Sequence, residues 1–179
     1  MKRNVFIFGG IAGLLVSTVM AVSAMSCVNN PDFEGNMVLG FGSMLVAFAF
    51  IFIGIKNYRD KQNGGVITFG KAFTLGLLIA LVASTIYVLT WLVEYYCFIP
   101  DFMEKYSAHV IKEAQESGVS GAALEKQIAD MESQKEMYKS PVWVVLFTYM
   151  EILPIGLAVA LISALILKRK VTKEPAPVV

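Results

Sequence analysis

Residues 72–93 have the sequence AFTLGLLIALVASTIYVLTWLV, which contains no charged side chain. A helix needs about 20 apolar residues to cross the roughly 30 Å hydrocarbon layer of a bilayer, and this run is long enough. In lipid, only helices and closed barrels satisfy every backbone polar group, and the run lacks the period-two alternation of a barrel strand. The sequence therefore predicts a transmembrane helix here.

Three further apolar runs cover residues 5–28, 37–55 and 142–167, and the run from residue 72 continues through Glu94 to residue 99. Hydrophobic residues make up 56% of the 179-residue chain and charged residues 16%, against about one quarter in soluble domains. We therefore expect an all-α integral membrane four-helix bundle in the lipid bilayer. Residues 1–170 would form its membrane domain and residues 171–179 a disordered tail. The net charge of +1 excludes the strongly basic surface of a nucleic-acid-binding protein.

The basic residues predict the orientation of the spans, because Lys and Arg near span ends are retained in the cytoplasm. Most of them lie before the first span, between the second and third, or after the fourth: Lys2, Arg3, Lys56, Arg59, Lys61, Lys71, Lys168, Arg169, Lys170 and Lys173. We expect a multi-pass protein of a bacterial inner membrane with both termini in the cytoplasm. The first span also resembles a cleavable signal peptide, but its apolar run continues to Val28, which favours an uncleaved anchor.

Small residues recur every four positions in three of the spans. In lipid, helices commonly associate through such residues, because they let two backbones approach closely. The predicted packing positions are Gly9, Gly13, Ser17, Ala72, Gly76, Ala80, Gly156 and Ala160. The sequence leaves open whether these faces pack within one chain or between copies, and membrane helices are rich in Gly and Ala in any case.

The segment at residues 101–139 predicts an outward helical hairpin, because an unstructured stretch of this length would be unusual. Its arms would cover residues 101–117 and 122–139, and Gly118 and Gly121 flank the turn. The apolar positions of the two arms are Met103, Tyr106, Val110 and Ala114, then Leu124, Ile128, Met131 and Tyr138. Ser140 and Pro141 predict that the fourth span begins afresh there.

The connector between the second and third spans reads GIKNYRDKQNGGVITFGKAFTLG at residues 54–76. Asn63, Gly64 and Gly65 predict a turn, since these residue types tolerate positive φ, and Thr68 is placed to cap the next helix. This stretch resembles the domain of unknown function 4199 family of small bacterial membrane proteins. The resemblance covers nearly the whole chain and is most specific at Asn57, Tyr58, Arg59, Gly64, Gly65, Phe69 and Gly70. It implies four transmembrane helices and no established activity, substrate or cofactor, so no site residues follow from it.

Two acidic residues, Glu94 and Glu151, are the only Asp, Glu, Lys, Arg or His side chains within the predicted spans. At 1.5 Å per residue from the outer prolines, they would lie about 9 and 15 Å deep, where they could approach each other. An ionised carboxylate at such depth costs a few kcal/mol or more, so one hypothesis for the pair, the less favoured of two, is a proton or cation pathway. The alternative is protonated glutamates hydrogen-bonded to Thr90, Tyr95, Thr148 or the backbone. Pro154 has no backbone N–H to donate to the carbonyl of Met150, so this carbonyl, beside Glu151, would be left without its helical hydrogen bond.

Cys27 and Cys97 lie at the outer ends of their spans, so either a disulfide or two unpaired thiols fits the predicted topology. His109 has no second histidine or cysteine at metal-ligand spacing, so we expect no metal site. The sequence shows no phosphate-binding loop, serine elbow or His-Cys pair. We therefore expect no enzyme and no cofactor.

The function expected from these features is non-catalytic. The small-residue faces and the hairpin at residues 101–139 favour association with a second copy or with another envelope protein. The rival hypothesis is a small proton- or cation-linked transporter or channel built around Glu94 and Glu151.

Overall fold

The computed structural model describes residues 1–29 and 37–169. Within these ranges the chain forms six helices and no strand: α1 Lys2–Asn29, α2 Met37–Gln62, α3 Phe69–Cys97, α4 Phe102–Glu116, α5 Ala122–Tyr138 and α6 Pro141–Leu167. Four of the described helices, α1, α2, α3 and α6, are long and apolar enough to cross a membrane. The prediction of an all-α membrane protein is confirmed. The tail predicted at residues 171–179 lies outside the described residues.

Two of the helices end at residues other than the ends of the apolar runs that predicted them. Helix α2 runs on to Gln62 rather than stopping at residue 55, because no glycine or proline interrupts it before the turn at Gly64. Helix α3 ends at Cys97 rather than at residue 99: the N–H groups of Phe98 and Ile99 both donate to the carbonyl of Glu94, at 2.9 and 3.0 Å. Pro100 follows, and proline disfavours the helical conformation of the residue before it.

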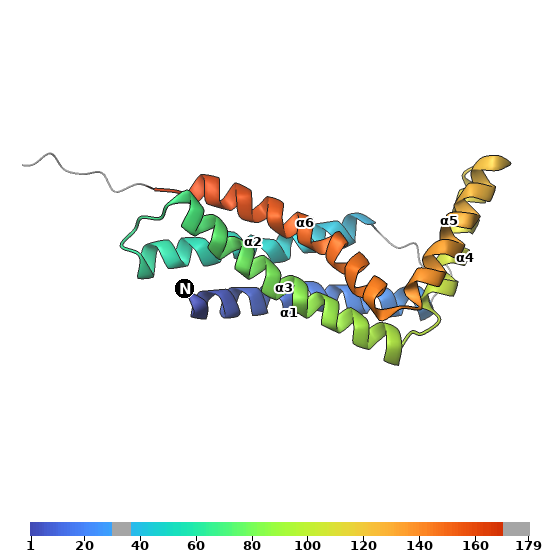
Figure 1. Ribbon diagram of the computed structural model, residues 1–179, viewed down its shortest axis with the longest axis horizontal. Helices are drawn as coiled ribbons and strands as arrows, with labels where there is room; N and C mark the ends of the chain where they lie inside the picture. Colours follow the sequence, from blue (N-terminus) through green and yellow to red (C-terminus); the bar gives the residue numbers. More distant parts are fainter. Residues whose placement is uncertain (30–36, 170–179) are drawn as a thin grey trace, which may run out of the picture.

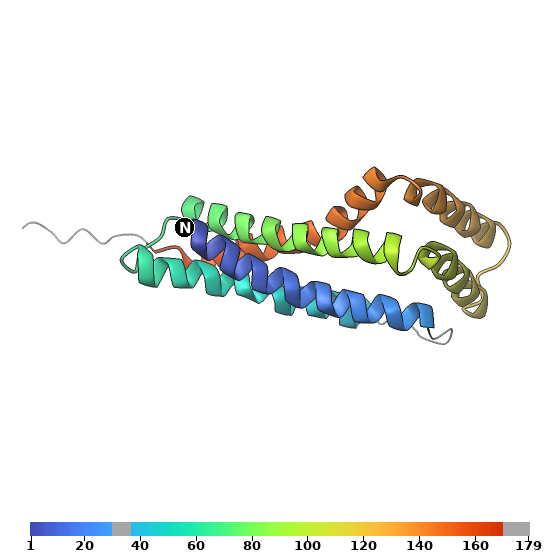
Figure 2. The same ribbon diagram turned by 90° about the horizontal axis from the view of Figure 1, so that it is seen from below.

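The four long helices form a bundle in which α3 and α2 each contact both α1 and α6 (Figure 1). Their directions alternate along the chain, so the N-terminus, the α2–α3 connection and the end of α6 share one end of the bundle. The described basic residues outside residues 101–139 gather there, and we call it the basic end. Figure 2 shows α4 and α5 side by side at the opposite end, running in opposite directions.

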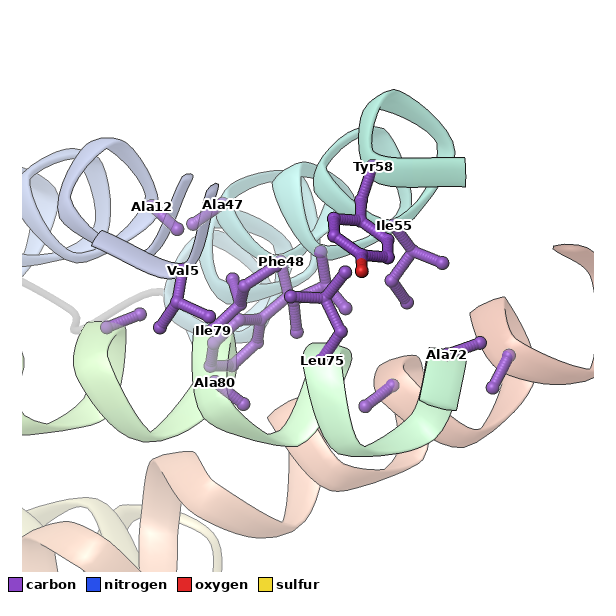
Figure 3. Packing of buried hydrophobic residues seen from close by; sticks show 14 of the residues in the cluster. Val5, Ala12, Ala47, Phe48, Ile55, Tyr58, Ala72, Leu75, Ile79 and Ala80 are labelled. Carbon is purple, nitrogen blue, oxygen red and sulfur yellow. The ribbon is translucent and has the colours of Figure 1, made fainter. Parts of the chain in front are cut away.

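Small residues let the helices approach closely inside a single chain. Figure 3 shows Ala12 of α1 facing Ala47 of α2, both fully buried. Helices α3 and α6 cross at two glycines: a Cβ added to Gly76 would lie 3.0 Å from the Cβ of Ala160, and one added to Gly156 would lie 3.0 Å from the Cβ of Ala80. These two contacts mirror each other across the crossing.

Helix α1 packs on α3 in the same way. A Cβ on Gly9 would lie 2.8 Å from the side chain of Val82, and one on Gly13 would lie 2.9 Å from that of Ile86. Ser17 is buried one turn further on, as is Ala72 at the start of α3. Each of the predicted small-residue faces therefore contacts another helix of the same chain.

The basic end is closed by backbone contacts. Gly64 and Gly65 have φ values of 64° and 79°, and the N–H of Gly65 donates to the carbonyl of Arg59 at 2.9 Å. Thr68 caps α3 by accepting a hydrogen bond from the N–H of Lys71. These observations confirm the predicted turn and cap. Ile67 and Arg169 also form an antiparallel bridge, which ties the connector to the end of α6.

Helices α4 and α5 start and end within one residue of the predicted arms, and Gly118 and Gly121 both have positive φ. The buried face of α4 differs from the prediction. Met103 and Ala114 are buried on it with Ser107, whereas Tyr106 is 39% exposed. Helix α5 has no fully buried residue.

Helix α6 begins at Pro141 as expected, with Ser140 at the N-cap position, although the Ser140 hydroxyl makes no capping hydrogen bond. Figure 1 shows α6 changing direction along its length, and Pro154 lies inside it. A proline inside a helix removes one backbone hydrogen bond and bends the helix.

Candidate functional site

A cavity of about 440 Å³ lies between the helices, towards the end of the bundle that carries α4 and α5. Each of the six described helices contributes to its wall. Cavities of this size, with mostly apolar walls and a few polar groups, are typical of sites for small molecules.

The acidic group of the cavity is Glu151 of α6. It is the one Asp, Glu, Lys, Arg or His side chain among the described residues that line this cavity. The hydroxyl of Tyr87, a buried residue of α3, donates to Oε1 of Glu151 at 3.4 Å. O–H···O hydrogen bonds usually measure about 2.5–3.0 Å, so this one is weak. A carboxylate offers about four lone-pair sites, so Glu151 keeps most of its accepting capacity for something inside the cavity.

Aromatic rings form much of the remaining wall. Trp91 of α3 meets Phe102 of α4 edge to face, with ring centroids 4.9 Å apart. Phe102 stacks on Tyr106 at 5.7 Å, and Tyr138 of α5 also lines the cavity. Aromatic pairs of this kind contribute about 0.5–1.5 kcal/mol beyond the area that they bury. The rings therefore hold α4 and α5 against α3, and Trp91, Phe102 and Tyr138 are among the residues that line the cavity.

Tyr138 is further fixed by rings on both sides. Its ring meets that of Tyr95 at 5.7 Å and stacks on Phe147 of α6 at 5.9 Å. Burial, and after it the negative charge of Glu151, raise the pKa of Tyr138 to about 12. The phenol of Tyr138 is therefore neutral at physiological pH.

Glu94, the other predicted carboxyl, lies apart from this cavity. It is 5% exposed and lines a second pocket of about 420 Å³ between α1 and α3, which shares no lining residue with the first. Neither of its carboxyl oxygens has a hydrogen-bond partner among the described residues. Buried polar groups without a partner are rare in folded proteins, so Glu94 is an unusual group in its own right.

Two of the three side-chain partners suggested by the sequence, Thr90 and Thr148, donate their hydroxyl groups to backbone carbonyls instead. The hydroxyl of Thr90 donates to the carbonyl of Ile86, and that of Thr148 to the carbonyl of Val144. Tyr87, which contacts Glu151, was not among the expected partners. Its spacing of four from Trp91 places both aromatic residues on one face of α3, and this is the signal that could have identified it.

The remaining candidate residues form no site within the described part of the chain. Cys97 is exposed at the end of α3, while the side chain of Cys27 lies outside the described residues, so the disulfide stays a prediction. His109 is half-buried on α4. Among the described residues, no three His, Cys, Asp or Glu side chains are grouped so that they could hold a metal ion.

A family model described as a protein of unknown function (DUF4199) matches residues 7–169, so the chain belongs to this family. No curated protein and no solved structure matches it. The resemblance at residues 54–76 is thereby confirmed. The family description assigns no activity to the cavity.

Proposed function

We propose that this family member is a small, non-catalytic membrane transporter or channel, linked to protons or cations, in which Glu151 carries the transported charge. The observation that supports this is the position of Glu151: a single carboxyl group facing a cavity from within a membrane-spanning helix, with one weak hydrogen bond. A carboxylate in the hydrocarbon region is costly, and such residues commonly mark proton or ion pathways. Binding a proton or a cation would remove that cost.

The direction of transport depends on the orientation, which we propose from the basic end. Lys and Arg near spans are retained in the cytoplasm. The basic end would then face the cytoplasm of a bacterium, and α4 and α5 would lie outside its inner membrane. The cavity would open in the outer half of the bilayer.

Reconstituted vesicles test this function. The purified chain is placed in liposomes that contain a pH-sensitive dye, and proton entry is followed after a potassium diffusion potential is imposed. We expect flux from the wild type and at least a tenfold loss in Glu151→Gln, which keeps the size of the side chain and removes its charge. Glu132→Gln, on the exposed surface of α5, is the matched control and should transport normally. An unchanged flux in Glu151→Gln would rule out the proposal.

A second candidate, association with an envelope protein, is favoured by helices α4 and α5. They stand beyond the four long helices in Figure 1, and α5 buries no residue completely. The small-residue faces that were expected to serve association are already used inside the chain, so residues 101–139 are the surface that remains for it. Cross-linking from Ser120→Cys in cells, with and without residues 101–139, would test this role. The same set of cross-linked proteins in both cases would count against it.

A further inference from the structure

The cavity combines a carboxylate with aromatic faces. Glu151 supplies the charge, and Trp91, Phe102 and Tyr138 supply rings from three different helices. The described lining contains no Lys, Arg or His to pair with Glu151. The negative charge is thus left without a cationic partner from the protein.

We propose that this cavity binds an organic cation: an ammonium or phosphonium centre with aromatic or alkyl substituents, whose charge lies near Glu151 and against the rings of Trp91 and Tyr138. The inference rests on the proposed function and names its substrate class. A cation over an aromatic face gains about 0.5–1 kcal/mol when exposed and about 2 kcal/mol or more when desolvated, and tryptophan is the best such ring. The carboxylate of Glu151 adds a direct charge interaction.

The same lining disfavours other ligands. An anion would meet the carboxylate and no basic side chain among the described lining residues. A hard metal ion such as Ca²⁺ is held mainly by carboxylate and carbonyl oxygens, whereas Glu151 is the one carboxylate in the described lining, and no three His, Cys, Asp or Glu side chains are grouped around it in the described residues. The volume of about 440 Å³ also far exceeds what a bare ion needs and suits a drug-sized molecule.

Methionines give this cavity an adaptable wall. Met20 of α1, Met44 of α2 and Met103 of α4 all line it. Met has three rotatable bonds and a polarisable sulfur, so it fits apolar groups of different shapes. We therefore expect the positive charge to be required and the apolar substituents to be interchangeable.

The charge around the cavity favours the same class of ligand. The segment that forms α4 and α5 contains more acidic than basic residues. This segment contributes lining residues to the cavity, and its net negative charge raises the local concentration of cations. Such a cation could be free in solution or be the ammonium headgroup of a lipid, because both present the same group to Glu151.

The binding experiment compares two ions of nearly the same size and shape. Tetraphenylphosphonium is a cation and tetraphenylborate is an anion, and each carries four phenyl rings. Equilibrium dialysis with the full chain in dodecyl maltoside micelles measures both affinities, with empty micelles as the background. We expect tetraphenylphosphonium to bind at least tenfold more tightly than tetraphenylborate. Equal affinities would overturn the proposal without any need for a variant.

Variants then locate the site. Glu151→Gln should weaken tetraphenylphosphonium binding at least tenfold, whereas Glu94→Gln, in the separate pocket, should leave it unchanged. A third variant, Trp143→Phe, removes the tryptophan of α6, which is 45% exposed and does not line the cavity. The chain has two tryptophans, so the fluorescence of this variant reports on Trp91 alone and should change when the cation binds. Undiminished binding in Glu151→Gln would contradict the assignment.

Two further comparisons separate the remaining outcomes. The first measures tetraphenylphosphonium binding in nanodiscs of phosphatidylglycerol, with and without added phosphatidylethanolamine. If a lipid headgroup is the natural occupant, phosphatidylethanolamine should weaken the binding that depends on Glu151. Unchanged binding indicates a free cation. Cation binding without proton flux would retain this inference and reject the proposed transport. Proton flux that depends on Glu151, together with equal affinities for tetraphenylphosphonium and tetraphenylborate, would retain the proposed transport and reject this inference.

Discussion

At the scale of single residues, the spacing of small side chains carries much of the packing information. The four-residue spacing includes Gly9 and Gly13 but excludes Gly10. A Cβ on Gly9 would lie 2.8 Å from Val82, while one on Gly10 would meet nothing within 4 Å. The period of the helix thus separates a packed glycine from an adjacent open one. It cannot identify the partner, because Val82 lies on a different helix.

Gly156 gives a direct test of this packing. A Cβ there would lie 3.0 Å from both the Cβ of Ala80 and Cζ of Phe48, at the crossing of α6 with α3 and α2. Overpacking of this kind costs about 1–3 kcal/mol. We expect Gly156→Val to lower the free energy of unfolding by that amount, measured by titration of detergent-solubilised protein with sodium dodecyl sulfate. Gly10→Val is the control and should cost little, and equal losses in both variants would contradict the packing.

The turn at the basic end tests backbone conformation instead. Gly65 has a φ of 79°, a region in which a residue with a Cβ is disfavoured by about 1–2 kcal/mol. Gly65→Ala should therefore be destabilised by roughly that amount in the same titration. Gly70→Ala, in the first turn of α3 with open space around it, should show no loss. A neutral effect of Gly65→Ala would indicate that the turn relaxes.

At the scale of helices, apolar runs and turn residues were enough to place every described helix. Apolar runs do not mark the ends of the helices: α2 extends past its apolar run, because a helix can continue through the charged residues that follow. The buried face of α4 was only partly predicted. The amphipathic pattern of α4 does not say which surface the helix packs against. That surface includes Trp91 of α3, which contacts Phe102 at the start of α4.

Tyr138 connects α5 to the bundle, and its titration tests that contact. Its pKa is raised from 10.0 to about 12, first by burial and then by the charge of Glu151. A raised folded-state pKa stabilises the fold fully below pH 10, and this contribution is lost as the pH rises towards 12. We expect the phenolate absorbance difference between the wild type and Tyr138→Phe to develop near pH 12. Development near pH 10 would show that α5 does not bury this ring.

At the scale of the whole molecule, the cavity is the feature that the sequence could not predict. Glu151 was identifiable because a carboxyl group inside an apolar run is rare. Its contact with Tyr87 joins residues 64 positions apart, and the surrounding wall draws on every described helix. Such a site depends on how the helices are arranged around one another, and periodicity along one helix carries no information about that arrangement.

The orientation in the membrane gives the last prediction, and it decides what the cavity can do. In a background without Cys27 and Cys97, an impermeant maleimide should label Ser120→Cys in intact cells, whereas Lys61→Cys should react only after lysis, because basic residues are retained inside. The cavity would then face the outside, where a membrane potential that is negative inside favours inward movement of a cation by about 2.3 kcal/mol per charge per 100 mV. The opposite labelling would place the cavity on the cytoplasmic side. The potential would then oppose export of the cation, and a coupled proton would have to drive it.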